Sequence, residues 1–160
     1  MGLKSQQDGK TAETLFENWC DREWIIYKKI KDAGVLTKRK KFFRLSQLCD
    51  YIIFQQSNSD FKFMVYTDGC DSINFVDVKK FTGKRMPMSF FYTSGKQNNT
   101  HKQVENFIEI SGLSSARVGV FHFVDIEKNE HYFVTSYDLE EASRCRKRSI
   151  SLKKCKSYLK

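Results

Sequence analysis

The strongest constraint on the fold of this chain is a series of short β-branched and aromatic segments bounded by polar residues. Segments of this kind predict strands. The run TDGCDS, which separates two of them, carries an Asp-Gly turn signal. The chain is therefore expected to build a central β-sheet. The predicted strands cover residues 24–30, 50–56, 61–66, 73–81, 117–124 and 131–136.

Two further segments have the apolar spacing of helices. The first, over residues 9–24, carries an i, i+3, i+4, i+7, i+8 stripe, typical of an amphipathic helix that packs on a core. The second covers residues 101–113 and is expected to end near Gly112. The order of the elements predicts an α/β or α+β domain with a central mixed sheet flanked by helices. The stripe of the first helix consists of Ala12, Leu15, Phe16, Trp19 and Cys20.

Length and composition favour one intracellular domain. A chain of 160 residues, 40% hydrophobic, is long enough to bury a core without disulfide or metal staples. The five cysteines show no metal-ligand spacing, and we expect them to be free thiols of the reducing cytoplasm. No segment approaches the roughly 20 apolar residues of a membrane span. We expect a folded domain over residues 1–143 and a basic C-terminal arm over residues 144–160.

The net charge of +9 favours a polyanionic partner. Nucleic acid is the simplest such partner, and an anionic membrane surface is a less favoured one. Lys and Arg side chains interleaved with Phe42 and Phe43 offer both phosphate neutralisation and stacking faces. The C-terminal arm is left open between a DNA-binding and a disordered segment. The predicted DNA contacts are Lys38, Arg39, Lys40, Lys41 and Arg44 in a basic loop, and Lys84 and Arg85 after the strand 73–81.

That strand carries an acid and a lysine at an unusual position. Residues i and i+2 of a strand share a face, so Asp77 and Lys79 are expected side by side, while Val76 and Val78 point the other way. Phosphodiester hydrolysis uses divalent metal held by oxygen ligands and a cation near the attacking water or the phosphate. An acid-x-Lys pair supplies one ligand and the cation. The same pair is also common as a structural ion pair on a strand.

Other polar residues extend this pattern. Asp50 stands at the head of an apolar strand, Glu13 lies on the first helix, and Gln103 opens the second. Each also has a structural interpretation: Glu13 as an exposed helix charge and Gln103 as a first-turn polar residue.

The order helix, strand, acid-headed strand, acid-x-Lys strand and helix with glutamine resembles that of the PD-(D/E)XK nucleases. More narrowly, GKTAETLFENW, CDYIIF, FVDVKKFTGKRMPMSF and HKQVENF look like segments of RecU-type and phage Holliday junction resolvases. The resemblance runs from about Gly9 to Val134. It implies a single restriction-endonuclease-like domain.

The resemblance also implies roles for individual residues. Asp50 and Asp77 would bind Mg²⁺ or Mn²⁺ together with the backbone carbonyl of Val78. Lys79 would orient the attacking water and stabilise the phosphate. Glu13 would act through water or as an outer ligand, and Gln103 would hold Lys79, the water or a phosphate.

The chain departs from the family pattern at three points. Asp77 stands where the family usually has Glu, and Cys49 where the wider superfamily has Pro. Asp50 and Asp77 are also 27 positions apart, farther than the resemblance implies. Residues 57–72 are then an inserted hairpin, or Asp60 is the first ligand instead; the position of CDYIIF after the basic loop favours Asp50.

The sequence thus predicts a Mg²⁺-dependent DNA endonuclease, in its narrower form a structure-specific Holliday junction resolvase. Cutting two strands symmetrically implies a homodimer or higher homo-oligomer. A sequence-specific restriction or homing endonuclease on the same core is the alternative enzyme. The alternative of another class is a non-catalytic basic nucleic-acid-binding module.

Overall fold

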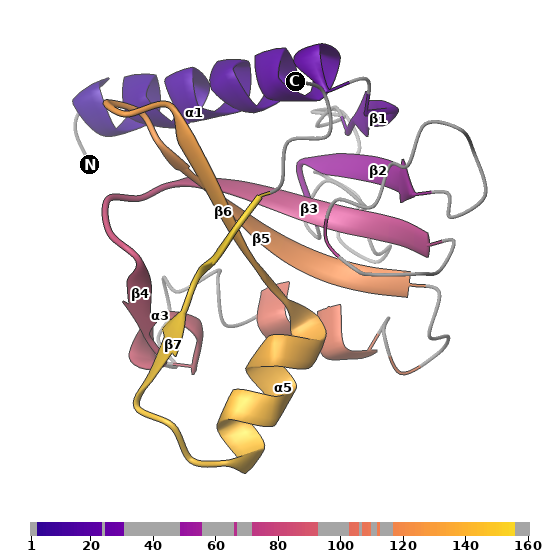
Figure 1. The fold of residues 1–160 in the computed structure, drawn as a ribbon, viewed down its shortest axis with the longest axis vertical. Coiled ribbons are helices and arrows are strands. Elements are labelled where there is room, and N and C mark those ends of the chain that lie inside the picture. Colours follow the sequence, from indigo (N-terminus) through magenta and orange to yellow (C-terminus); the bar gives the residue numbers. More distant parts are fainter. Residues whose placement is uncertain are drawn as a thin grey trace, which may run out of the picture.

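The computed structural model shows a β-sheet with helices on both faces (Figure 1). The predicted mixed α/β architecture with a central sheet is confirmed. The structure describes residues 3–23, 25–30, 49–55, 66, 72–92, 103–105, 107–109, 112 and 117–155. The elements are α1 (Leu3–Arg22), β1 (Tyr27–Lys29), β2 (Tyr51–Gln55), β3 (Ser72–Lys80), β4 (Arg85–Pro87), α3 (Ser89–Tyr92), β5 (Arg117–Asp125), β6 (Glu130–Thr135), α5 (Ser136–Arg144), β7 (Ser149–Ser151) and β8 (Lys153–Lys154).

Within these ranges the main sheet has six strands in the order β1-β2-β3-β5-β6-β8. β1, β2 and β3 form an antiparallel meander, whereas β3 and β5 run parallel. β5 and β6 form an antiparallel hairpin, and β8 pairs with the far side of β6. A parallel step needs a long crossover, and the chain between β3 and β5 includes β4, α3 and the helical residues 103–105 and 107–109.

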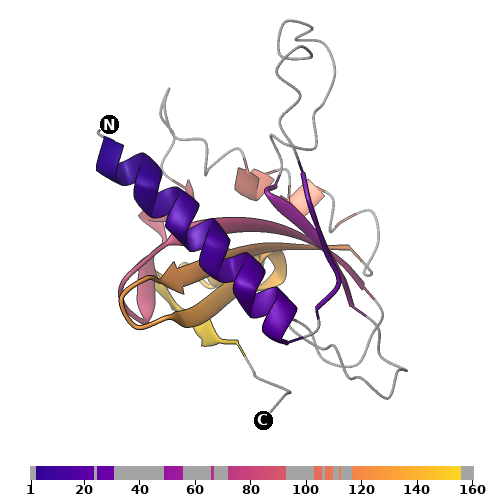
Figure 2. The ribbon, with the colours of Figure 1, turned by 90° about the horizontal axis from the view of Figure 1, so that it is seen from above.

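α1 covers one face of the sheet, as Figure 2 shows from above. Its predicted apolar stripe is the face that packs, with Phe16 and Cys20 fully buried. The Phe16 ring lies 4.6 Å, centroid to centroid, from the Tyr51 ring of β2. Val76 of β3 and Val120 of β5 complete this core from the sheet side. We call it the α1-side core.

The opposite face is covered by α3, the helical residues 103–109 that are described, and α5. β5 alternates between the two faces: Val120 points to the α1-side core, whereas Phe121 and Phe123 belong to the second core. Gly119 has to be a glycine, because a Cβ atom there would overlap the ring of Phe107. This second core also holds Met86, Met88, Phe91, Val104, Leu139 and Leu152.

The structure differs from the sequence predictions mainly in the length and number of short elements. The strand expected over 24–30 is reduced to β1, because the Ile25 N–H still donates to the Cys20 carbonyl at the end of α1. α5 was not predicted. It begins at a capping box in which Thr135 and Asp138 each bind the other's backbone N–H.

The basic segment expected as an arm at 144–160 begins inside the fold. β7 pairs with β4, β8 pairs with β6, and Leu152 between them is buried. Residues 156–160 lie outside the described residues. So do the basic loop and the strand predicted over 61–66, apart from Tyr66, which is buried.

Candidate active site

The antiparallel pairing of β2 and β3 places Asp50 next to Asp77. Tyr51 is the register partner of Val76, so the residue before Tyr51 stands opposite the residue after Val76. The Asp50 N–H donates to the Val76 carbonyl at 2.9 Å, and the Asp50 carboxylate accepts from the Val78 N–H at 2.9 Å. The backbone of Asp50 is also held from β1, since its carbonyl accepts from the Ile30 N–H at 2.9 Å.

Asp77 is held by Lys79 and Gln103. One carboxylate oxygen lies 2.8 Å from the Lys79 ammonium, and the other accepts a hydrogen bond of 2.9 Å from the Gln103 side-chain amide. Lys79 comes from the same face of β3, as the two-residue period predicts. Gln103 comes from the crossover between β3 and β5. The Asp77 side chain is only 6% exposed, so these contacts replace water at a buried carboxylate.

Burial and the neighbouring Asp77 carboxylate make ionisation of Asp50 unfavourable. Burial raises the pKa of Asp50 to about 8, and the charge of the neighbouring Asp77 carboxylate adds to this shift. The hydrogen bond from the Val78 N–H acts in the opposite direction on this pKa. Near neutral pH the Asp50–Asp77 pair therefore retains one proton unless a metal cation takes the place of that proton.

Lys79 is positioned by aromatic rings as well as by Asp77. Its ammonium nitrogen lies 5.9 Å from the centroid of the Phe90 ring on α3 and 5.8 Å from that of Phe121 on β5. Cation–π contacts of this kind stabilise a charged ammonium where water is partly excluded. The side chain is still 23% exposed. Lys79 is thus both restrained and accessible from solvent.

Glu13 lies at the margin of this group. It belongs to α1 and pairs with Lys29 of β1 at 3.5 Å. Its charge also raises the pKa of Asp50, but as the smallest of the causes. The structure therefore brings together Asp50, Asp77, Lys79 and Gln103, with Glu13 approaching from the opposite layer.

The donors present fit a hard divalent cation. Mg²⁺ and Mn²⁺ prefer carboxylate and carbonyl oxygen, and Asp50 and Asp77 supply two carboxylates next to the backbone of Val78. Apart from its ion pair with Lys79, one buried Asp77 oxygen has no hydrogen-bond donor in the part of the chain that the structure describes. Among the described residues, however, no three His, Cys, Asp or Glu side chains form a metal cage. A bound cation would keep part of its water shell, as Mg²⁺ usually does.

The predicted DNA contacts divide into two groups. Lys84 and Arg85 are exposed, and the Arg85 guanidinium donates to the Ser149 hydroxyl at 2.8 Å. The others, together with Asp60, lie outside the described residues: Lys38, Arg39, Lys40, Lys41 and Arg44.

A buried polar network that the sequence did not predict lies on the α1 side of the sheet. His122 of β5 contacts His131 of β6 (Nε2 to Nδ1, 2.8 Å) and the Tyr66 hydroxyl (3.0 Å). Burial lowers the pKa of His122 and that of His131, the latter to about 4, so both rings are neutral. The two histidines are diagonal neighbours on one face of the β5–β6 hairpin. The predicted hairpin alone would therefore have placed them close together.

Comparison of the chain with protein-family models, with curated proteins and with solved structures finds no match in any of the three. In the described ranges, no helix combines the length and apolar character needed to cross a bilayer.

Proposed function

We propose that this protein is a metal-dependent DNA endonuclease that hydrolyses phosphodiester bonds. The observation that carries the proposal is the contact of Asp77 with both Lys79 and Gln103, beside Asp50. A buried and a partly buried carboxylate whose like charges repel each other, with an ammonium beside them, form an arrangement suited to a divalent cation and a phosphate.

Each residue has a chemical role in this proposal. Asp50 and Asp77 would hold Mg²⁺ or Mn²⁺ with the Val78 carbonyl, and such a cation would supply Lewis-acid chemistry to the phosphate and the attacking water. Lys79, fixed by Asp77, orients the attacking water and stabilises charge that develops on the phosphate oxygens. Gln103 positions Asp77 by donating to the oxygen that Lys79 does not contact.

The order of these residues along the fold supports the PD-(D/E)XK assignment within this proposal. Helix α1 carries Glu13, β2 is headed by Asp50, β3 carries Asp77 and Lys79, and a helical segment carries Gln103. This is the order on which the resemblance rests. The assignment to a junction resolvase rests on the four resembling sequence segments, and it entails a homodimer with two cleavage centres related by a two-fold axis.

The test is cleavage of a labelled four-way junction beside a linear duplex of the same sequence, with and without Mg²⁺. Wild type is compared with Asp77→Ala, Lys79→Ala and Asp50→Ala, and with Asp60→Ala to settle the first ligand. Glu127→Ala, an exposed residue of the β5–β6 turn, is the control. Light scattering of the intact protein measures its oligomeric state.

We expect paired Mg²⁺-dependent nicks on the junction alone. These nicks should be lost in the Asp77 variant and in one of the other acid variants. Cutting of the linear duplex at a defined site would replace the resolvase by a restriction or homing endonuclease. Binding of DNA without cutting in Mg²⁺ or Mn²⁺ would refute the enzyme and leave a basic binding module.

A further inference from the structure

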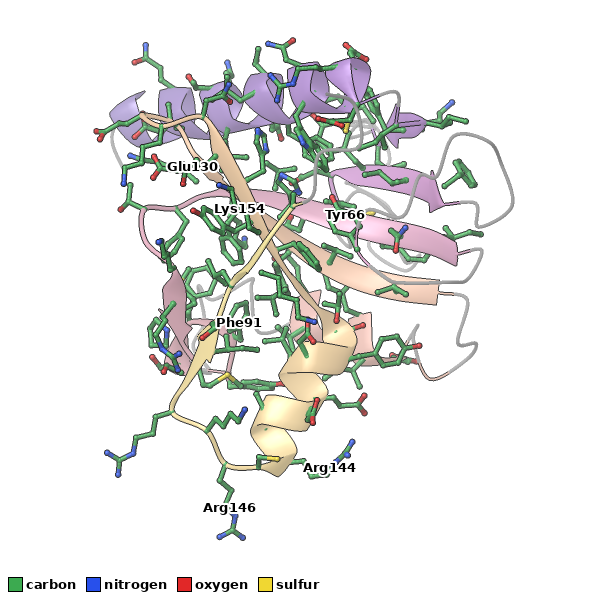
Figure 3. All side chains as sticks on the ribbon, in the orientation of Figure 1. Tyr66, Phe91, Glu130, Arg144, Arg146 and Lys154 are labelled. Atoms are coloured by element: carbon green, nitrogen blue, oxygen red, sulfur yellow. The ribbon has the colours of Figure 1, made fainter. Side chains whose placement is uncertain are left out.

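The end of α5 and the turn that follows it carry the densest run of basic residues in the part of the chain that the structure describes. Arg144, Arg146, Lys147 and Arg148 occupy four of five consecutive positions, and all four are exposed. Figure 3 shows the side chains of Arg144 and Arg146 extending outward from the end of the molecule opposite α1. Within the described ranges, none of the four is ion-paired with an acidic residue.

The backbone of this turn is fixed. N–H groups of Cys145, Arg146 and Lys147 donate to carbonyls of the last turn of α5 at 2.9–3.1 Å. Arg146 adopts a φ of 53°, in the left-handed region where helix ends usually place glycine. A non-glycine residue in this backbone conformation costs conformational energy. Residues strained in this way are often found at functional sites.

A second strand adds to the same surface. β4 pairs with β7, and the Leu152 N–H donates to the Lys84 carbonyl at 2.8 Å. Lys84 and Arg85 are both exposed, and the hydroxyls of Ser149 and Ser151 fix the Arg85 guanidinium. We call the whole surface the basic end. It consists of Lys84, Arg85, Arg144, Arg146, Lys147 and Arg148.

Charges near the end of a helix also stabilise its dipole, and this accounts for part of the basic turn. It does not account for Lys84 and Arg85, which lie just before β4 and at its start. A pocket of about 260 Å³ beside the basic end is lined by Arg85, Lys147 and Lys153 but also by Asp138 and Glu141, and Lys153 is ion-paired with Asp138. The two carboxylates offset two of the three positive charges, so a small anion gains little inside the pocket and the exposed cations fit an extended polyanion better.

The basic end is connected to the candidate active site through α3. The Met88 N–H, just before α3, donates to the Arg148 carbonyl at 2.8 Å. Two residues further on, Phe90 lies against the Lys79 ammonium. Both regions therefore belong to the layer that covers the face of the sheet opposite α1.

We infer that the basic end binds the phosphate backbone of nucleic acid and so provides a contact surface in addition to the residues of the cleavage centre. The inference rests on the proposed function for the identity of the polyanion. Neutralising these cations is expected to weaken binding uniformly across sequences and to reduce its salt dependence, because phosphate contacts release counterions.

The test measures affinity for a labelled junction and a duplex in EDTA, over a series of salt concentrations. The variant Arg144→Gln, Arg146→Gln, Arg148→Gln is compared with Lys10→Gln, Arg22→Gln, Lys128→Gln, which removes the same charge from exposed positions elsewhere. Replacement of the same three arginines by lysine tests rescue, and circular dichroism verifies that each variant folds.

We expect the basic-end variant to bind about tenfold or more weakly than the control variant. Its slope of log affinity against log salt should flatten by about 2.7, since each phosphate contact contributes about 0.9. The lysine variant should bind like wild type.

Equal losses in the basic-end and control variants would overturn the inference even if cleavage is intact. Binding without cleavage would refute only the enzyme. Binding to phosphatidylserine vesicles but not to nucleic acid would overturn the inference in favour of a membrane surface.

Discussion

Replacing Asp50 by asparagine should stabilise the protein while abolishing cleavage. In the folded protein burial and the Asp77 carboxylate raise the pKa of Asp50 from 3.8 to about 8. Between these values the fold retains a proton that the unfolded chain releases. The contribution of Asp50 to stability is therefore present below pH 3.8 and is lost as the pH rises towards 8. An amide oxygen can still accept the hydrogen bond from the Val78 N–H but carries no charge.

The size of the effect follows from the linkage between protons and folding. One proton of difference changes the free energy of unfolding by about 1.4 kcal/mol per pH unit. The advantage of Asp50→Asn over wild type should therefore grow by at most about 2.7 kcal/mol between pH 5 and pH 7. For a chain of this length that difference corresponds to a shift of about 5–10 °C in Tm.

The assay is thermal and urea unfolding of both proteins from pH 5 to pH 8. Glu127→Gln, which neutralises an exposed carboxylate, is the matched control and should follow wild type. Mg²⁺ should raise the Tm of wild type near pH 7, because a cation replaces the proton, and should have little effect on Asp50→Asn. Parallel pH curves for Asp50→Asn and wild type would refute the carboxylate coupling on which the site is built.

Four further substitutions concern residues away from the catalytic group. Arg146→Gly should stabilise the fold by about 1 kcal/mol, since the left-handed backbone suits glycine, while weakening nucleic-acid binding; unfolding and binding titrations measure the two effects. Gly119→Ala should destabilise by about 1–3 kcal/mol, because its Cβ overlaps Phe107, whereas Gly9→Ala on exposed α1 should stabilise by about 1 kcal/mol, both by urea unfolding. The lowered pKa of His131 makes the unfolded chain bind its proton first, so stability should fall from pH 6.5 towards 4, and His131→Asn should flatten that slope.

The parts of the site that follow from local periodicity were accessible from the sequence. The two-residue period of a strand is enough to place Asp77 beside Lys79. The position of Asp50 was harder, because it depends on the register between β2 and β3, and sequence alone left Asp60 as an alternative. Gln103 contacts Asp77 only through the crossover, a tertiary relation that no local pattern specifies.

The elements that were missed are those with little or no period. β4, β7 and β8 contain two or three residues each, too few to show an alternating pattern. They form because a partner strand is nearby. α5 was different, since Thr135 and Asp138 carry the sequence signature of a capping box and would have predicted its start.

A purely structural explanation accounts for Asp77 and Lys79 but not for Asp50. An ion pair on a strand, helped by an amide from Gln103, is a common stabilising arrangement. Asp50 is a second carboxyl group beside this ion pair. Burial and the Asp77 charge raise the pKa of Asp50, so it opposes folding near neutral pH. Asparagine would keep the same backbone hydrogen bond without that cost. An acidic group that opposes folding near neutral pH at a partly buried site is typical of residues that bind a cation or do chemistry. The stability of Asp50→Asn therefore bears directly on function: if it exceeds that of wild type, packing alone cannot explain why an acid occupies this position.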